Sequence, residues 1–219
     1  ILEGVTASAL TVDNFTPSFP PNGDSSPGQT LNGTANADEL IGGFGDDVID
    51  GKGGNDVIDG QAGSDRIKGG SGNDTIEGGF GDDHLYGEAG NDTITDDQGS
   101  NVLDGGSGDD NLTSQSLSGH HDLQGGVGND RLIATGKTVN LEGGDGNDSL
   151  SANGALHVSG VTSYVEEGEA RLDGGSGRDS LSVSYYDEAQ LFGGTDDDVL
   201  SANHSKNVEL SGGDGDDSL

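Results

Sequence analysis

The sequence predicts an all-β protein, a parallel β-solenoid of about ten coils of eighteen residues each. Nine consecutive nonapeptides run in constant phase from residue 33 to residue 113, with no insertion between them. Each nonapeptide carries Leu or Ile at its eighth position, in a chain that is otherwise polar and rich in glycine. The same turn motif then returns at longer spacings as far as the last residues of the chain. A fixed short period is typical of solenoids, in which each repeat buries its apolar face only by stacking on its neighbours.

Composition alone would favour a disordered chain. The 219 residues include 43 glycines, only 28% hydrophobic residues, and 41 acidic against 8 basic side chains, for a formal charge of −33. Disordered chains have such compositions, but disorder gives no reason to place Ile or Leu at every ninth position. The acidic balance argues against nucleic acid as a partner and favours cations. There is no run of 18 apolar residues, so we expect no membrane insertion by this segment, and the absence of Cys excludes disulfides.

Residues 1–30 differ from the rest of the chain. The stretch "VTASALTVDNF" alternates well enough to predict a strand, which would end a preceding β-domain. It is followed by "TPSFPPNGDSSPG", which holds all four prolines and predicts a linker. We place the boundary near Thr30, and we expect the chain to be a fragment of a longer polypeptide, because it stops at Leu219 inside another repeat unit.

Each position of the nonapeptide has a physical role in the segment 31–113. Paired and spaced glycines, as in "GGFG" from Gly42, predict a tight turn whose carbonyls can point inward. Positions seven to nine, such as "VID" from Val48, predict a very short strand with its middle side chain buried. One turn and one strand form half a coil, so two nonapeptides complete a coil. The opposed strands then place Ile49 and Ile58 on the two sides of one core.

The core predicted in this way is too thin to hold the fold alone. Burying Ile or Leu is worth roughly 1.5–3 kcal/mol, whereas fixing the backbone of one residue costs about 1–2 kcal/mol, and only about one residue in nine is a reliable core residue. The sixth position is Asp in every one of the nine units except at Asn101. An Asp of one unit, the Asp one coil later and inward carbonyls form an oxygen-only cage of the kind that Ca²⁺ prefers. Asp47 should therefore share an ion with Asp65, and Asp56 with Asp74.

The motif GGxGxDxUx, present here as "GGFGDDVID", "GGSGNDTIE", "GGFGDDHLY" and "GGSGDDNLT", resembles the calcium-binding nonapeptide repeats of the RTX (hemolysin-type) family. The resemblance covers residues 33–219. It implies a parallel β-roll with Ca²⁺ between successive turns on the same side, carried by proteins that leave the cell by type I secretion and fold outside it. The family includes toxins, proteases, lipases, epimerases and adhesins, so the repeat does not name an activity.

If the coils stack in order, the units at 33, 51, 69, 87, 105, 125, 143, 174, 193 and 212 form one edge, and those at 42, 60, 78 and 96 form the other. Adjacent pairs of units predict roughly 8 to 12 Ca²⁺ ions, with degenerate turns at Asn101 and at Asp196. The predicted ligands are Asp side chains with carbonyls of the first and third positions: Asp38, Gly42, Phe44, Asp47, Gly51, Gly53, Asp56, Gly60, Ala62, Asp65, Gly69, Ser71, Asp74, Gly78, Phe80, Asp83, Gly87, Ala89, Asp92, Gly105, Ser107, Asp110, Gly125, Val127, Asp130, Gly143, Asp145, Asp148, Gly174, Ser176, Asp179, Gly193, Thr195, Asp198, Gly212, Asp214 and Asp217.

The segment 114–219 keeps the full turn motif only once per coil. The other half of each coil keeps a core Leu two residues before each Gly pair, and its turns are degenerate. We therefore expect calcium turns on both edges in the segment 31–113, and on one edge with variable loops on the other in the segment 114–219. The longest of these variable segments spans residues 152–170.

Other candidate sites carry weaker signals. His120 and His121 could suggest a metal site, but a pair without a third ligand is more often an exposed polar loop. Tyr164, Tyr185 and Tyr186 could contact a glycan or a protein, and the commoner role is to cover a narrow core. There is no recognisable Ser, His and Asp arrangement, helix-borne acid pair or phosphate loop, so we expect no catalytic site in this segment.

Three functional hypotheses follow. The first is a non-enzymatic calcium-binding β-roll in a secreted, extracellular or bacterial cell-surface protein, which folds on Ca²⁺ after export and acts as a structural, stalk or adhesion-associated module. The second is an accessory module of a secreted polysaccharide-modifying enzyme similar to alginate epimerases, with Lys137, Arg171, Lys206 and the tyrosines as its binding surface. The third is self-assembly, as in an extracellular matrix or surface layer, in which neighbouring copies stack at the coil ends through shared calcium.

Overall fold

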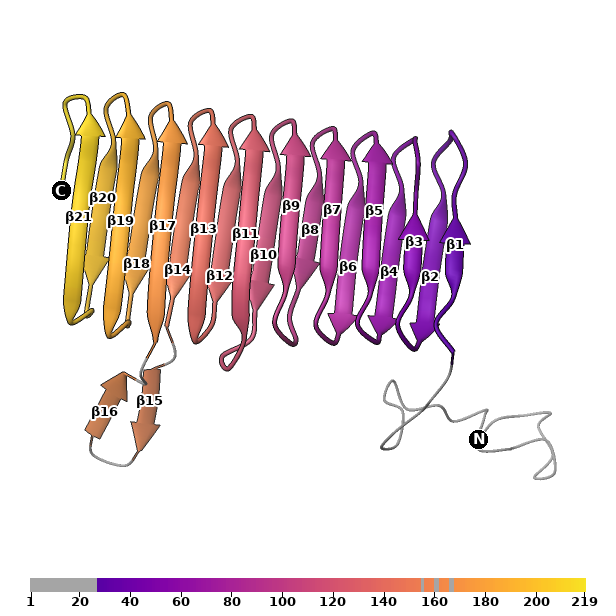
Figure 1. The fold of residues 1–219 in the computed structure, drawn as a ribbon, viewed down its shortest axis with the longest axis horizontal. Coiled ribbons are helices and arrows are strands. Elements are labelled where there is room, and N and C mark those ends of the chain that lie inside the picture. Colours follow the sequence, from indigo (N-terminus) through magenta and orange to yellow (C-terminus); the bar gives the residue numbers. More distant parts are fainter. Residues whose placement is uncertain (1–26, 155, 160–161, 166–167) are drawn as a thin grey trace, which may run out of the picture.

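A computed structural model of the chain describes residues 27–154, 156–159, 162–165 and 168–219 as a parallel β-solenoid (Figure 1). It confirms the predicted fold class, since every described element is a strand and two long parallel sheets face each other. The strand and most of the linker expected in residues 1–30 lie outside the described residues.

The two sheets are built from alternate strands. The ten-strand sheet holds β1 (Thr30–Asn32), β3 (Val48–Asp50), β5 (Arg66–Ser71), β7 (His84–Ala89), β9 (Val102–Ser107), β11 (His120–Val127), β13 (Thr138–Asp145), β17 (Glu169–Ser176), β19 (Glu188–Thr195) and β21 (Asn207–Asp214). The nine-strand sheet holds β2 (Glu39–Phe44), β4 (Val57–Ala62), β6 (Thr75–Phe80), β8 (Thr93–Asp96), β10 (Asn111–Gln115), β12 (Arg131–Thr135), β14 (Ser149–Asn153), β18 (Ser180–Ser184) and β20 (Val199–Asn203).

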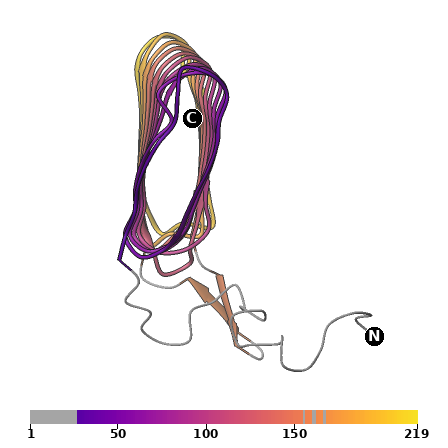
Figure 2. The same ribbon diagram turned by 90° about the vertical axis from the view of Figure 1, so that its right-hand side faces the viewer.

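The coils stack directly on one another. Seen along the solenoid axis, they superpose as a flattened ring with one sheet on each long side (Figure 2). The register carries Ile49 onto Ile67 and then onto Leu85, one coil at a time. We call the turns that lead from the ten-strand to the nine-strand sheet the first edge, at the top of Figure 1, and the turns that lead back the second edge, at the bottom.

Apart from β1 and β3, the strands of the two long sheets are longer than the three residues that the repeat predicts. β4, for example, runs from position seven of one unit through position three of the next. Gly60 has no partner in the pairing of β4 with β6. Asp59 pairs with Glu77, and the next pair is Gln61 with Gly79. The strand thus continues through the Gly pair, with a local break in pairing at the first glycine.

The predicted core residues form the interior. The eighth-position side chains from Ile49 to Leu112 are buried and belong to one continuous cluster. Leu123, Leu141, Leu172 and Leu191 continue the same column after residue 113, as expected from their place before the Gly pairs. Leu40 and Leu210, at the two ends of the solenoid, are only partly buried.

The second half of the solenoid has a wider core than the sequence suggested. In the ten-strand sheet, β13, β17 and β19 gain residues at their starts and bury Val139, Ala170 and Ala189. In the nine-strand sheet, three small apolar side chains are buried two residues after the core Leu: Ala134, Ala152 and Val183. The long variable segment forms a two-stranded antiparallel hairpin, β15 (Leu156–Ser159) and β16 (Thr162–Val165), which leaves the second edge (Figure 1).

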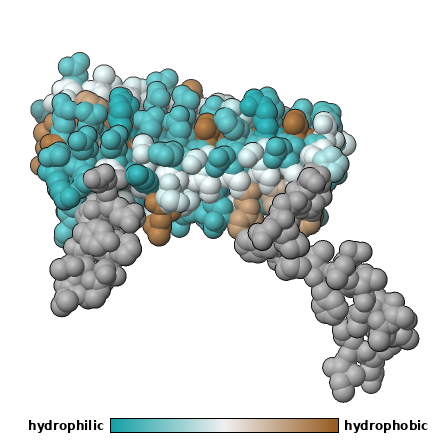
Figure 3. Space-filling model, turned by 60° about the horizontal axis from the view of Figure 1, so that its bottom comes forward, coloured by the Kyte–Doolittle hydropathy of each residue, from teal (hydrophilic) through white to brown (hydrophobic). Residues whose placement is uncertain are grey.

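The outer surface is mainly hydrophilic. Viewed with the second edge turned forward, hydrophobic residues form small, separated spots rather than one continuous patch (Figure 3). The part of the chain that the structure describes holds no helix with the length and apolar composition of a membrane span.

Candidate metal-binding turns

The Gly-rich turns take the backbone conformation that their glycines predict. In the unit that begins at Gly42, Gly43 has φ 121° and Gly45 has φ 97°, both in the region that disfavours side chains. Three units carry Lys52, Gln61 or Glu88 at the second position, and each of these residues also has a positive φ. The turn shape is therefore kept even where a side chain makes it strained.

The sixth-position Asp residues form two stacked columns along the edges. The backbone N–H of Asp47 donates to Oδ1 of Asp65 at 2.8 Å, and the N–H of Asp56 donates to Oδ1 of Asp74 at 2.8 Å. The structure therefore brings together the two Asp pairs for which the sequence predicts a shared ion. The same bond links successive coils on the first edge as far as Asp198 and Asp217, at 3.0 Å.

The second oxygen of each stacked carboxylate is buried without a donor. No hydrogen-bond donor contacts Oδ2 of Asp47, Asp56, Asp65, Asp74, Asp83, Asp92, Asp110, Asp130, Asp148, Asp179 and Asp198. A buried polar atom without a partner is destabilising, and these eleven side chains are each at most 3% exposed. Repetition of the same unpartnered atom in every coil identifies a set of sites that need a positive ligand.

The first glycine of each unit leaves space for such a ligand. A Cβ atom placed on Gly60 would overlap with Oδ2 of Asp65 and would lie 2.6 Å from the carbonyl oxygen of Gly78, one coil later. The same pair of oxygens, an Asp Oδ2 and a Gly carbonyl of the next coil, faces Gly42, Gly87 and Gly125. The carbonyl of the first position therefore points inward beside the carboxylate, as the Gly-rich turn predicts.

Burial shifts the titration of these acids. It raises the pKa of Asp65, Asp110 and Asp179 to about 7 each, and that of Asp92 and Asp148 to about 6. The backbone N–H groups that donate to these carboxylates act in the opposite direction without offsetting burial. A site that disfavours a bare negative charge in this way is stabilised by a cation.

The donor set fits a hard cation that takes oxygen ligands. The described residues contain no group of three or more His, Asp or Glu side chains around one point, so backbone oxygens must complete any site. Carboxylate and carbonyl oxygens together are the ligands of Ca²⁺. The carbonyls of the third positions also take part in the ladder: those of Ala62 and Phe80 accept from the backbone N–H of Gly45 and Gly63 at 2.8 Å, which leaves each a second lone pair.

The two ends of the solenoid differ from its interior. Oδ2 of Asp38 accepts from the N–H and the hydroxyl of Thr34, at 2.6 Å and 2.9 Å, so it has the donors that interior acids lack. Asp217 lies on the last described coil and is partly exposed. The first positions Gly33 and Gly212 and the third position Asp214 also belong to these end coils.

The column of acids on the second edge ends at Asn101. The first-position glycines Gly42, Gly60 and Gly78 are followed, in register, by Asp96 and then by Ser114. Burial, and next the neighbouring carboxyl of Asp83, raises the pKa of Asp96 to about 9. The repeat pattern does not predict Asp96 as a ligand, because Asp96 lies at the first position of its unit and not at the sixth.

A neutral hydrogen-bonded network closes the second edge. Asn101 Nδ2 donates to Ser114 Oγ at 3.4 Å, Ser114 Oγ bonds His121 Nδ1 at 2.8 Å, and His121 Nε2 lies 3.2 Å from the carbonyl of Ser116. These partners place the proton on Nε2, and burial lowers the pKa of His121. The prediction of an exposed histidine pair is wrong for His121, which is buried, while His120 is exposed.

Of the residues proposed for glycan binding, Tyr185, Tyr186 and Lys206 lie on neighbouring turns of the second edge, and each of their side chains has a partner within the chain. Tyr186 is buried, and its hydroxyl donates to the carbonyl of Gly136 at 3.2 Å, so it belongs to the core. Tyr185 stacks on His204 with ring centroids 5.0 Å apart. Lys206 pairs with Asp187. The side chain of Tyr164 lies outside the described residues.

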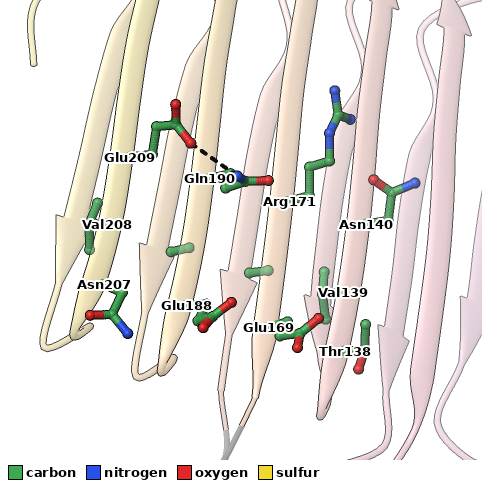
Figure 4. A pocket seen from close by; sticks show the side chains of 12 residues that line it. Thr138, Val139, Asn140, Glu169, Arg171, Glu188, Gln190, Asn207, Val208 and Glu209 are labelled. Carbon is green, nitrogen blue, oxygen red and sulfur yellow. Dashed lines mark hydrogen bonds between the residues drawn. The ribbon is translucent and has the colours of Figure 1, made fainter.

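An open groove of about 740 Å³ lies on the outer face of the ten-strand sheet, between β13 and β21 (Figure 4). Its only cationic side chain is that of Arg171, which bonds Asp173 at 2.7 Å and lies over the ring of Phe192. The carboxylates that line it are those of Glu169, Glu188 and Glu209. This excess of negative charge does not favour an acidic polysaccharide in the groove.

Comparison with known proteins agrees with this geometry. The family model for the RTX calcium-binding nonapeptide repeat matches the chain in four copies, at residues 29–58, 59–94, 86–115 and 123–154. No match was found among curated proteins or solved structures. The matched residues make up more than half of the chain, and the buried carboxylates repeat in the same units. The chain therefore belongs to the family of proteins that carry RTX calcium-binding nonapeptide repeats, and its described part is a calcium-binding β-roll module.

Proposed function

We propose that this β-roll folds when it binds Ca²⁺ outside the cell and then acts as a stiff, non-catalytic spacer within a secreted or surface-displayed protein. One observation carries the proposal: the column of buried carboxylate oxygens without donors, repeated at every interior coil of the first edge from Asp56 to Asp198. A fold that buries like charges above one another is unfavourable until cations lie between them.

The chain itself does not supply those cations. Its eight Lys and Arg residues face 41 acids, and the ion pairs of the described residues involve none of the eleven buried acids. Extracellular calcium modules bind at about 10⁻⁴ to 10⁻³ M. Each site at the tighter end of this range adds on the order of 1 kcal/mol of stability at millimolar Ca²⁺. Many sites in series would make folding depend on the calcium concentration around the chain.

Because folding depends on calcium, the chain would be exported before it folds. A chain with such weak sites stays unfolded where calcium is scarce and gains its coils where calcium is abundant. A solenoid with two continuous sheets along its length suits a spacer, because each coil contacts only its neighbours. Type I secretion, surface display and adhesion are therefore parts of this proposal.

The test is a calcium titration of the whole chain, followed by far-ultraviolet circular dichroism and by small-angle scattering. We expect an expanded, largely unstructured chain without calcium, and a cooperative gain of β-structure with compaction at millimolar calcium. Magnesium at the same ionic strength is the control, because it prefers octahedral sites with several waters. At pH 8, where the buried acids are ionised, a spectrum that is already β-rich without calcium, or that responds equally to magnesium, would contradict the proposal.

A further inference from the structure

The last Gly–Asp turn of the second edge contains a carboxylate that the repeat motif does not provide. We propose that Asp96, together with Asp83, is a calcium ligand at the site between the units that begin at Gly78 and Asp96, where it takes over the role lost at Asn101. This inference deepens the proposed function and rests on it.

The side chain of Asp96 points into the space that a cation would occupy. It is fully buried, and its Oδ1 accepts from the backbone N–H of Gln98 at 3.1 Å. Its Oδ2 has no donor, and neither has Oδ2 of Asp83. A Cβ atom placed on Gly78 would overlap with Oδ2 of Asp96 and would lie 2.8 Å from Oδ2 of Asp83. Two unpartnered carboxylate oxygens thus face the same first-position glycine.

The regular turn one coil earlier shows which group Asp96 replaces. There, the space beside Gly60 is bounded by Oδ2 of Asp65 and by the carbonyl oxygen of Gly78 at 2.6 Å. Beside Gly78, the nearest group of the next coil is instead the carboxylate of Asp96. A carboxylate oxygen of the next coil therefore lies closer to this position of Gly78 than any backbone oxygen does.

Asn101 cannot supply the missing charge. Its Oδ1 accepts from the N–H of Asp83 at 3.0 Å, as the Asp of a regular unit does. Its Nδ2 donates to the carbonyl of Gln98 at 2.9 Å, so these two partners fix which end of the amide is nitrogen. The atom that replaces the unpartnered Oδ2 of a regular Asp is thus a donor, which has no affinity for a cation.

With Asp96 as ligand, the site keeps the two carboxylates of a regular pair. Neither Asp83 nor Asp96 takes part in an ion pair of the described residues. Two carboxylates buried beside one another need a cation or a proton. With this ligand, the second edge would hold one more site than its sixth-position residues indicate.

The experiment counts the calcium ions bound per chain, by native mass spectrometry and equilibrium dialysis of the whole protein. Asp96→Asn should bind one ion fewer than the wild type at millimolar calcium. Asp97→Asn is the matched control, because residue 97 is exposed and loses the same charge, and it should bind the wild-type number. An Asp96→Asn chain with the wild-type number and affinity would overturn the inference.

A double variant decides the question even if Asp96→Asn does not fold. Asp96→Gly with Asn101→Asp restores the regular motif, so it should bind the wild-type number of ions if Asp96 is already a ligand. A gain of one ion in the double variant would show that the wild-type site is empty and that Asp96 is no ligand. A wild-type chain that binds no calcium would contradict the proposed function itself, which is a different result.

Discussion

Along the second edge, the N-terminal and C-terminal halves of the solenoid fill the same position of the coil with different groups. From β2 to β6, the first-position residues are Gly42, Gly60 and Gly78, and an acid with an unpartnered oxygen lies beside each. In β12, β14 and β18, the same column holds apolar side chains that are fully buried: Ala134, Ala152 and Val183. Asp96 and Ser114 lie between the two sets. A coil of this size is therefore completed either by an ion among oxygens or by apolar side chains.

The first edge keeps its stacked acids in both halves of the chain, which makes it an internal reference. Its acids stack from Asp56 to Asp198 with the same bond between successive coils. We therefore expect the N-terminal half to depend on calcium at two edges, and the C-terminal half at one. Differences in calcium response between the halves report on the second edge alone.

Removing calcium tests this comparison with the largest expected effect. As calcium is lowered by dialysis against a chelator, amide protons of β4 and β6 should lose protection at a higher calcium concentration than those of β18 and β20. The reason is that the apolar column of the C-terminal half needs no ion on the second edge. Hydrogen exchange followed by mass spectrometry measures both halves in one sample. Simultaneous loss, or earlier loss in the C-terminal half, would contradict the comparison.

The pH dependence of the calcium-free chain should have the opposite sign to that of the calcium-loaded chain. Burial raises the pKa of Asp65 and Asp110 to about 7, above their unfolded values near 4. The folded state therefore binds more protons, and its stability is greatest at low pH and is lost as pH rises through about 6 to 7.

Circular dichroism of the chain without calcium, at pH 5 and at pH 8, should show more β-structure at pH 5. With millimolar calcium the order should reverse, because protons then compete with the ion for the same oxygens. Asp65→Asn is the informative variant, since it should weaken the pH dependence without calcium and lower the calcium-loaded stability. A calcium-free chain that is more structured at pH 8 would show that these acids are not buried as described.

Exchanging glycine and alanine between the two halves of the second edge should have a smaller effect on stability. Gly60→Ala places a Cβ atom against Asp65 Oδ2 and the carbonyl of Gly78, so it should remove one bound ion and lower the calcium-loaded stability by about 1–3 kcal/mol. Gly60 does not have a positive φ, so the effect arises from the added atom. Ala152→Gly is the matched reverse change, and it should lower stability by about 1 kcal/mol with no change in bound calcium. Equal calcium binding by Gly60→Ala and the wild type would place the ion elsewhere.

The sequence predicted the regular part of this architecture because a nine-residue period fixes both coil length and register. Once Ile49 and Ile67 occupy equivalent positions, Asp47 must lie beside Asp65, and the structure confirms that placement. What the period could not predict lies where the units degenerate. The side chain of Asp96 enters the interior only because its strand continues into the next unit.

The wider core of the C-terminal half was also beyond the repeat pattern. The repeat motif is defined by Gly and Asp. Leu132 with Ala134, and Leu150 with Ala152, follow a different pattern in which every second residue is apolar and buried. This alternation was present in the sequence as "LIA" and "LSA" and is typical of a half-buried strand. His121 follows the same alternation, since it lies two residues before the buried Leu123, and Ser114 and Ser116 provide hydrogen-bond partners for its ring.

The smallest expected effect concerns Tyr186, which covers the apolar column of the C-terminal half. Tyr186→Phe removes the hydroxyl that donates to the carbonyl of Gly136 and should lower stability by about 0.5–1.5 kcal/mol. Tyr185→Phe is the control, because it keeps the ring that stacks on His204 and should change stability by less than about 0.5 kcal/mol. Thermal unfolding at two saturating calcium concentrations measures both variants. The effect of Tyr186→Phe should be the same at both concentrations and leave the number of bound ions unchanged, since this column is closed by side chains. A Tyr186→Phe chain that loses an ion would mean that the second edge still binds calcium beyond Ser114, and the distinction between the two halves would then fail.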